Sequence, residues 1–312
     1  METRILGRTG LEVSVMGLGA GGPSRLGQRD EVKSEAESVS LVLQALDAGI
    51  NFIDTAEAYR TEDIVGKAVA QRDRASVIIS TKKRLGGSAI TRAELRAGLE
   101  DSLRRLRTDY VDIYHLHGLR PEDYDYYLNE IAPFMQDLQA RGMIRFLGVT
   151  ESWSRDLGHD MLQRALQDDI WDVIMVGFNL LNQTARETVL AQASEKQIGA
   201  LIMFAVRLAL SRPDRLRRAL ESLIETGELD AREIDLDRPL GFLGEDGLDP
   251  DTTDAAYRFC RDEPGVHVVL SGTSNPQHLA ANLASFARPP LPPQHTARLQ
   301  RIFRNVVSAT GG

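Results

Sequence analysis

The chain has very little cysteine, no long apolar run and no excess of positive charge. Its only cysteine, Cys260, excludes an internal disulfide and a cysteine-based zinc site, and we expect an inert, partly buried thiol. No stretch approaches the roughly 18–20 apolar residues that span a bilayer, and the N-terminal residues lack the apolar core of a signal peptide. The formal net charge of −8 argues against nucleic-acid and anionic-membrane partners. We therefore expect a cytoplasmic protein.

What the sequence does contain is a regular alternation of strand and helix patterns. Short apolar runs predict buried strands at about 15–19, 51–54, 77–82, 111–117, 145–149, 172–176, 200–204 and 266–271. Helical patterns lie between them, and three begin with S/T-x-x-E capping boxes: Ser34/Glu37, Thr91/Glu94 and Thr184/Glu187. Eight βα units without a break in composition predict the α/β class, with a (β/α)8 TIM barrel forming one domain over residues 1–312.

Two more elements are expected outside the barrel. Residues 4–13 hold two short apolar pieces around a turn, which predicts an N-terminal β-hairpin. Residues 294–307 follow a proline-rich stretch and predict an added C-terminal helix.

Gly17, Gly19 and Gly22 formally match the G-x-G-x-x-G fingerprint of Rossmann-type dinucleotide sites. In such sites the third glycine opens a helix, but here a proline follows and the helical pattern starts only near residue 31. We therefore interpret the glycines as a tight turn after the first barrel strand, where the backbone can approach a ligand closely.

The segment 225–251 interrupts the alternation of strand and helix patterns between the seventh and eighth strands. Its acidic residues outnumber its basic ones ten to two, and four glycines are interspersed. It is either a solvated acidic loop or a lid over cofactor or substrate, since long βα-loops lie on the catalytic face of a barrel. A calcium site is a weaker interpretation, because the regular spacing of oxygen ligands is absent.

Titratable residues stand at the ends of three successive predicted strands. Asp54 closes the second strand, Lys82 the third and His117 the fourth. A carboxylate that ends a buried strand is costly unless it is paired, and Lys82 is the nearest cation by topology. Because the C-terminal ends of barrel strands converge on one mouth, we expect these three side chains and Tyr59 to lie together.

Such a set could reduce a carbonyl by hydride transfer, which leaves charge on the oxygen and requires a proton donor there. We expect the Lys82 ammonium, held by Asp54, to lower the pKa of Tyr59 from about 10. Tyr59 would act as acid in reduction and as base in oxidation, while His117 orients the substrate oxygen or shares the proton. The alternatives are a structural Asp54–Lys82 ion pair, a core histidine and a packing tyrosine.

Other titratable residues near these positions are given no catalytic role. Strand parity places His115 on the side of His117, facing the barrel interior, and turns Lys83 away from the side of Lys82. His159 and two further histidines show no partner in the sequence, and no metal site is expected.

Four motifs together resemble the aldo-keto reductases: residues 51–56 with Tyr59, 80–82, 112–117 and 142–150. The likeness extends over nearly the whole chain. It implies an NAD(P)-dependent oxidoreductase that interconverts an aldehyde, ketone or sugar carbonyl and an alcohol, with NADP(H) or NAD(H) as cofactor and a small molecule as substrate. The same resemblance assigns catalysis to Asp54, Tyr59, Lys82 and His117.

Cofactor contacts are expected at two helix starts and in several loops. Ser211 and Asn275 precede prolines at positions typical of N-caps, where phosphates bind. The resemblance implies that Phe204 stacks on the nicotinamide, and that residues from the last strand and helix hold the adenosine end: Gly272, Thr273, Ser274, His278 and Asn282.

Some positions depart from the family pattern. Thr150 and Glu151 replace a Ser-Asn pair that holds the carboxamide, and Met175 replaces a glutamine. Gly272 and His278 stand where lysine and arginine often clasp a 2′-phosphate, although Arg207 could supply replacement charge. NAD(H) is therefore as plausible as NADP(H). A non-catalytic, nicotinamide-binding regulatory or interaction protein on the same barrel stays open as the alternative.

Overall fold

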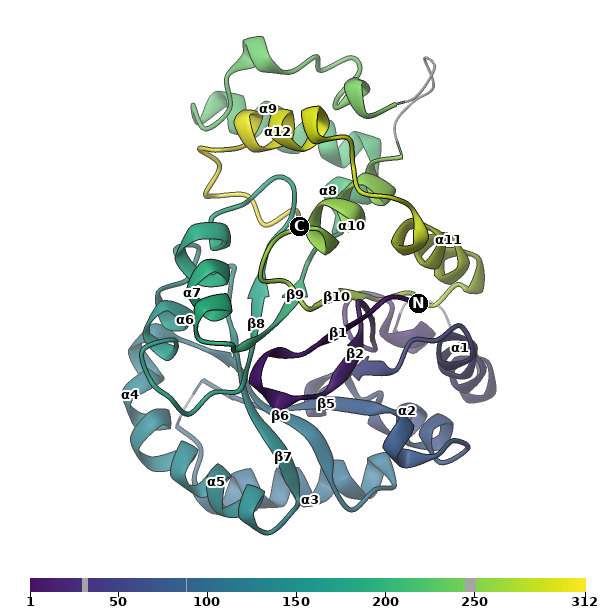
Figure 1. Ribbon diagram of the computed structural model, residues 1–312, viewed down its shortest axis with the longest axis vertical. Coiled ribbons are helices and arrows are strands. Elements are labelled where there is room, and N and C mark those ends of the chain that lie inside the picture. The colour runs from purple at the N-terminus through teal and green to yellow at the C-terminus, as the bar shows by residue number, and fades with distance from the viewer. Residues whose placement is uncertain (30–32, 88, 245–250) are drawn as a thin grey trace.

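The computed structural model describes residues 1–29, 33–87, 89–244 and 251–312 and consists of a barrel of parallel strands surrounded by helices (Figure 1). In barrel order the strands are β10 (Val268–Ser271), β3 (Met16–Gly19), β4 (Phe52–Asp54), β5 (Ile78–Arg84), β6 (Val111–Leu119), β7 (Ile144–Glu151), β8 (Val173–Gly177) and β9 (Gly199–Met203). Every neighbouring pair is parallel and the ring is closed. The predicted (β/α)8 TIM barrel is confirmed, and a Rossmann-type sheet is excluded.

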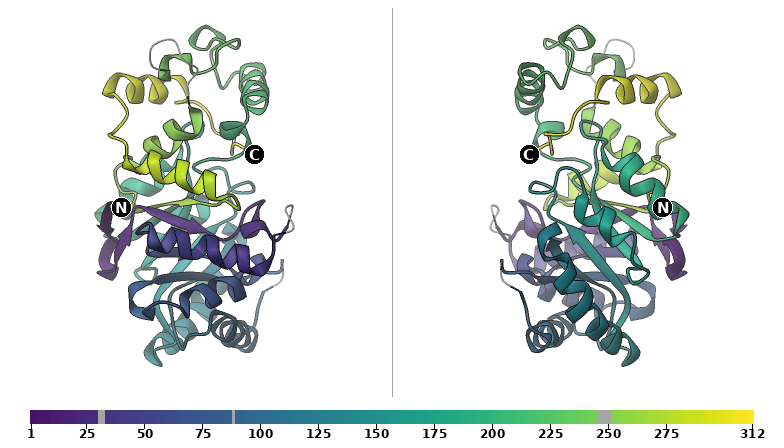
Figure 2. Two further views of the ribbon diagram at one scale, coloured as in Figure 1. Left: turned by 90° about the vertical axis from the view of Figure 1, so that its right-hand side faces the viewer. Right: turned by 90° about the vertical axis from the view of Figure 1, so that its left-hand side faces the viewer.

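Helices cover the outside of the barrel, as the views in Figure 2 show. Their bounds are α1 (Glu35–Asp47), α2 (Glu62–Val69), α3 (Arg92–Leu106), α4 (Tyr124–Tyr126), α5 (Ala132–Ala140), α6 (Asp160–Ala165), α7 (Ala191–Glu195), α8 (Leu208–Ser211), α9 (Pro213–Glu225), α10 (Thr252–Arg261), α11 (Pro276–Ala287) and α12 (Pro293–Ile302). Among the described helices, none is both long and apolar enough to cross a bilayer.

The predicted capping boxes have different outcomes. Those at Ser34/Glu37 and Thr91/Glu94 are confirmed, with reciprocal side-chain and backbone hydrogen bonds at the starts of α1 and α3. The third, at Thr184, is wrong. The Thr184 hydroxyl donates to Asn182 Oδ1 at 2.6 Å, and the following turn is a π-helix, Arg186–Leu190, without a side-chain cap. A local bond to Asn182 and a tertiary contact with His159 Nε2 have replaced the capping box.

The N-terminal hairpin closes one end of the barrel. Strands β1 (Thr3–Ile5) and β2 (Glu12–Ser14) pair antiparallel across a 3-10 turn. Three hairpin residues, Leu6, Leu11 and Val13, belong to the same apolar cluster as the first residues of several barrel strands, Phe52, Ile78, Val173 and Val268. Since active sites of such barrels lie at the opposite, C-terminal ends of the strands, the hairpin contributes to stability.

The C-terminal helix is shorter than predicted. It ends at Ile302 rather than near residue 307, and the following residues run as an irregular tail. The backbone N–H groups of Val307 and Ser308 donate to Glu228, and the carbonyl of Thr310 accepts from the Asn179 amide at 3.3 Å. The tail is therefore held by the segment that follows α9 and by the loop that follows β8.

The acidic segment packs against this C-terminal part, and its residues 245–250 lie outside the described residues. Glu233 pairs with Arg301 of α12 at 2.9 Å, and the guanidinium of Arg298 lies 4.2 Å from the ring centroid of Phe242. Figure 1 shows α9 and α12 at the same end of the molecule. These contacts attach the described part of the segment to α12, and the lid hypothesis stays untested.

Candidate active site

The strand register brings the predicted titratable residues together. Asp54 pairs in register with Ser80, and on the next ladder Lys82 pairs with His115. Tyr59 ends a 3-10 turn, Glu57–Tyr59, that directly follows β4. The four side chains predicted from the sequence, those of Asp54, Tyr59, Lys82 and His117, therefore meet at the C-terminal ends of β4, β5 and β6.

A buried ion pair forms the base of this group. Lys82 Nζ lies 2.7 and 2.6 Å from the two carboxylate oxygens of Asp54 and donates a further bond to the carbonyl of Thr55 at 2.7 Å. The two side chains are 0% and 4% exposed. Burial by itself would lower the pKa of Lys82, but the charge and hydrogen bonds of Asp54, together with the neighbouring Tyr59, offset it and raise that pKa. The ammonium is therefore held charged.

Tyr59 lies over this pair. Its ring centroid is 5.0 Å from Lys82 Nζ, and its hydroxyl oxygen is 3.5 Å from His117 Nε2. The ring packs flat on Gly21, where an added Cβ would approach Tyr59 Cε2 to 2.5 Å. The glycine turn after the first barrel strand thus makes room for the phenol.

The predicted lowering of the Tyr59 pKa is wrong for this structure. Burial raises the pKa of Tyr59, and the Lys82 ammonium opposes that rise without reversing it. The phenol is consequently protonated at neutral pH, which is the state a proton donor needs.

His117 is neutral at neutral pH. Burial, together with the charges of Lys82 and Arg84, lowers its pKa to about 3. A neutral imidazole can donate or accept a hydrogen bond but carries no proton to give up as an imidazolium. Of the two roles expected for His117, the geometry favours orienting a substrate oxygen beside the Tyr59 hydroxyl.

Strand parity correctly predicts the neighbouring side chains. His115 is fully buried inside the barrel, with Nε2 3.1 Å from the Ser80 hydroxyl. Lys83 points outward, where its Nζ lies 3.1 Å from Glu57 and fills the space beside Gly98 of α3. Within the described residues, no group of three or more side chains is placed to hold a metal ion.

The residues expected at the nicotinamide end are engaged with the protein itself. The Thr150 hydroxyl accepts a bond from the Gly118 backbone at 2.8 Å. Glu151 accepts from the Gly177 backbone at 2.7 Å through one oxygen, and its other oxygen lies 2.8 Å from His159 Nδ1. Met175 is 3% exposed and packs in the apolar barrel interior.

His159 is a residue that the sequence interpretation missed. Besides Glu151, it contacts the Thr184 hydroxyl through Nε2 at 2.8 Å, and its ring is nearly parallel to that of Trp153. The signal was available in Glu151: a carboxylate at the end of a buried strand requires a partner, as Asp54 does. The position of that partner, eight residues later in a loop, could not be read from the pattern.

Aromatic rings and one cation lie next to this network. Phe204 is stacked with Trp153, with ring centroids 6.1 Å apart and planes at 13°. The guanidinium carbon of Arg207 lies 4.3 Å from the Phe204 centroid, and its Nη1 donates to Thr310 Oγ1 at 3.1 Å. Burial lowers the pKa of Arg207. Among the described residues Arg207 has no carboxylate partner, and its guanidinium packs against Gly312 of the C-terminal tail.

The residues expected at the adenosine end surround the start of α11. Asn275 caps that helix, accepting from the Gln277 backbone at 2.8 Å. Thr273 and Ser274 are buried beside it, His278 is exposed on its first turn, and Asn282 is buried and donates to the Ser271 hydroxyl at 2.8 Å. An added Cβ at Gly272 would come within 3.0 Å of the Gly19 carbonyl, so the two turns are in close contact.

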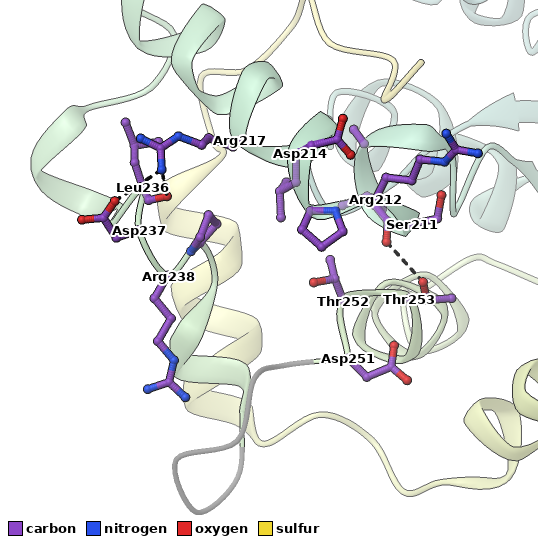
Figure 3. A pocket seen from close by; sticks show the side chains of 15 residues that line it. Ser211, Arg212, Asp214, Arg217, Leu236, Asp237, Arg238, Asp251, Thr252 and Thr253 are labelled. Carbon is purple, nitrogen blue, oxygen red and sulfur yellow. Dashed lines mark hydrogen bonds and ion pairs between the residues drawn. The ribbon is translucent and has the colours of Figure 1, made fainter.

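The predicted N-cap at Ser211 is wrong. Ser211 ends α8, and Arg212 occupies the cap position of α9 without a side-chain hydrogen bond. Ser211 lines a pocket of about 510 Å³ between α9, residues 236–239 and the start of α10 (Figure 3). None of the four expected catalytic residues is among those that line it, so this pocket is separate from the Tyr59 site.

The mouth of the barrel fits a nicotinamide dinucleotide at its anionic part. It offers the capped start of α11, the close glycine turns and the half-buried Arg207. Trp153 adds a buried indole N–H that has no hydrogen-bond partner in the described part of the chain. The fit is poorer at the carboxamide, because both oxygens of Glu151 already form hydrogen bonds within the protein and Met175 is apolar.

Comparison with known proteins agrees with this geometry. The model of the Aldo/keto reductase family matches residues 16–304. The Bacillus subtilis protein named uncharacterized oxidoreductase YqkF is 28% identical over 91% of this chain and 90% of its own length. The L-galactose dehydrogenase of Arabidopsis thaliana is 36% identical over 48% of each chain. The holo form of an aldo-keto reductase from Bacillus halodurans, 24% identical, superposes with a TM-score of 0.74 over 98% of both chains. Because the family model covers most of its length, the chain belongs to the aldo/keto reductase family.

Proposed function

We propose that this chain is an NAD(P)-dependent oxidoreductase that interconverts the carbonyl of an aldehyde, ketone or sugar with an alcohol. Its family generally carries out NAD(P)-dependent carbonyl reduction. The observation that supports catalysis in this particular chain is the buried Asp54–Lys82 pair beneath a protonated Tyr59, with neutral His117 at 3.5 Å from the phenol oxygen. We propose a single catalytic domain acting on a small-molecule substrate.

Each of the four side chains has a separate task. When bound, the reduced nicotinamide supplies the hydride. Tyr59 donates its phenolic proton to the carbonyl oxygen, and Lys82 stabilises the negative charge that the phenol then carries. Asp54 keeps Lys82 charged and fixed, and His117 donates a hydrogen bond that orients the substrate oxygen. In the oxidising direction the Tyr59 phenolate accepts the proton.

The cofactor is expected to occupy the loops that follow β7, β9 and β10. We propose that Phe204 packs against the nicotinamide and that Arg207 leaves its present place over that ring to pair with a phosphate. Thr150, Glu151 and Met175 would then contribute the shape of the nicotinamide site rather than amide contacts. Gly272, Thr273, Ser274, His278 and Asn282 would surround the adenosine end.

The replacement of Tyr59 by phenylalanine tests the function. Tyr59→Phe removes only the hydroxyl, so we expect kcat to fall by about 10²–10⁴-fold while the dissociation constant of the cofactor changes little. Turnover is measured across a panel of aldehydes, ketones and sugars, and cofactor binding by fluorescence titration. Full activity of the variant would refute the role of Tyr59. Cofactor binding by the parent without turnover of any substrate would favour the regulatory alternative.

The preference between NAD(H) and NADP(H) depends on the basic residues that would bind a 2′-phosphate. Gly272 and the exposed His278 offer no fixed cation to a 2′-phosphate. We therefore expect NAD(H) to bind about as tightly as NADP(H), measured by titrating both in parallel. A hundredfold preference for NADPH would contradict this expectation, and its loss in Arg207→Ala would identify Arg207 as the replacement.

A further inference from the structure

The hydrogen bonds of the catalytic group continue into the barrel beyond the four expected residues. Ser80 Oγ lies 2.8 Å from Asp54 Oδ1, and His115 Nε2 lies 3.1 Å from Ser80 Oγ. Ser80 and His115 are both 0% exposed and come from the neighbouring strands β5 and β6. Lys82 and Ser80 thus approach the same carboxylate, and His115 lies behind Ser80.

The direction of each hydrogen bond in the series His115–Ser80–Asp54 follows from the last acceptor, the Asp54 carboxylate. A carboxylate can only accept, so the hydroxyl proton of Ser80 must point to Asp54. The Ser80 oxygen is then left to accept from His115, which requires the proton of the imidazole to be on Nε2. Burial, with the charge of Lys82, holds the pKa of His115 far below its usual value, although the backbone of Val149 acts in the opposite direction. His115 is therefore a neutral imidazole with an unprotonated Nδ1.

The surroundings of His115 fix the ring in this orientation. On the β7 side it packs against Gly148, where an added Cβ would lie 2.2 Å from Nδ1. Nδ1 has no hydrogen-bond partner within the described part of the chain. Burying an unpaired polar atom costs free energy. The hydrogen bond from Nε2 to Ser80 is the favourable polar contact that offsets this cost.

We propose that Ser80 and His115 are positioning residues that hold the Asp54 carboxylate, and through it the Lys82 ammonium, in place beneath Tyr59. This inference rests on the proposed function. The positive ends of the Ser80 and His115 dipoles both point toward Asp54, so they balance part of its charge. Without them the potential at Tyr59 becomes less positive, and the phenol becomes a weaker proton donor.

The tautomer of His115 can be tested without any turnover. In protein labelled with 15N-histidine, the His115 signals, assigned by comparison with His115→Gln, should show a neutral ring protonated on Nε2. Ser80→Ala should shift the Nε2 signal because its acceptor is lost. A ring protonated on Nδ1, a charged ring, or an Nε2 signal that does not respond to Ser80→Ala would overturn the proposal.

The functional consequence is tested by a matched set of variants. His115→Leu removes the donor, His115→Gln keeps an N–H at a similar distance, and Ser80→Ala breaks the chain in the middle. For His115→Leu and Ser80→Ala we expect kcat to fall about tenfold, with KM and cofactor binding within about twofold of the parent. The alkaline limb of the pH–rate profile should move to higher pH. His115→Gln should recover most of the rate.

Two controls separate positioning from a general loss of packing. His267→Gln changes a half-buried histidine whose Nδ1 accepts from the Ala200 backbone at 3.1 Å near the start of β10, so it should alter thermal stability but not the pH profile. In the double variant Ser80→Ala/His115→Leu, kcat should fall no further than in either single variant. Each of the three variants already interrupts the same series of hydrogen bonds to Asp54. Additive losses, or an unmoved alkaline limb, would show that the two residues only fill space.

The outcomes also distinguish this proposal from the proposed function. If no carbonyl or alcohol is turned over, the proposed function fails, while the 15N experiment still decides whether the His115–Ser80–Asp54 chain exists. If turnover is found but the His115 and Ser80 variants behave like His267→Gln, the proposed function survives and the positioning role is refuted.

Discussion

Removal of the Lys82 charge should destabilise this protein far more than removal of the neighbouring Lys83 charge. Lys82 is fully buried against Asp54, with Nζ 2.6 Å from the carboxylate, so Lys82→Met leaves a buried, unpaired anion. Breaking a buried pair in this way costs about 3–5 kcal/mol, a large part of the ~5–15 kcal/mol that stabilises a typical domain. Lys83 is itself only 11% exposed, but its partner Glu57, at 3.1 Å, is 31% exposed and stays hydrated when the lysine is removed, so Lys83→Met should cost about 1 kcal/mol.

The double variant shows whether the cost comes from the unpaired charge. Asp54→Asn combined with Lys82→Met removes both charges and keeps an oxygen that can accept from Ser80. We expect it to be more stable than Lys82→Met alone by about 2 kcal/mol, because the buried anion is gone. Free energies of unfolding come from urea titrations at pH 7. Turnover should be lost in both variants, so recovery of stability without activity would separate the two roles of the pair.

The free energy of unfolding of Lys82→Met should depend on pH, and the direction of that dependence is an independent test. Burial raises the pKa of Asp54, and Lys82 acts against that rise, so the variant should have a still higher Asp54 pKa in the folded state. A carboxyl whose folded pKa exceeds its unfolded pKa stabilises the fold when protonated. The stability deficit of Lys82→Met should therefore shrink as the pH falls from 8 to 5. Equal losses in Lys82→Met and Lys83→Met, or a deficit that grows toward acid, would refute the reasoning.

Two further predictions concern His117 and Trp153. Since the pKa of His117 is lowered to about 3, kcat should show no histidine limb between pH 5.5 and 8, and stability should fall as the pH drops below about 6.5, less steeply in His117→Gln. A limb near pH 6.5 that disappears in His117→Gln would contradict a neutral His117. An added Cβ at Gly177 would lie 2.1 Å from the Trp153 ring, so Gly177→Ala should cost about 1–3 kcal/mol in unfolding titrations and weaken cofactor binding several-fold. Gly86→Ala, with no heavy atom within 4 Å, is the control, and equal behaviour of the two variants would argue against a fixed indole.

The barrel and the meeting of the four titratable residues could be predicted because both follow from short-range patterns. Parallel strands buried on both faces read as apolar runs, and each observed strand begins or ends within about two residues of its predicted bounds. Parity then fixes which residue of a pair such as Lys82 and Lys83 faces the interior. The N-cap at Asn275 was predictable for the same reason, since the residues it bonds are its immediate neighbours.

The rest depended on contacts between distant segments. Thr184 has the local pattern of a capping box, but its hydroxyl donates to Asn182 and also contacts His159 Nε2 instead of capping the helix. The pKa of Tyr59 depends on how deeply the 3-10 turn buries the phenol. The sequence predicts which charges are near Tyr59 but not how far it is buried. The single-domain organisation, the catalytic roles and the cofactor contacts stay predictions.

The hairpin that fills the N-terminal end of the barrel has a practical consequence. Leu6, Leu11 and Val13 lie at the end opposite Tyr59, and the interior between them is occupied by side chains. Engineering for heat tolerance can therefore be confined to the hairpin and to the first residues of the strands that it covers, away from Met175 and the rest of the proposed cofactor site. Conversely, loop substitutions at the mouth that change the substrate but destabilise the protein can be offset by stabilising substitutions in the hairpin, because the two regions lie at opposite ends of the barrel.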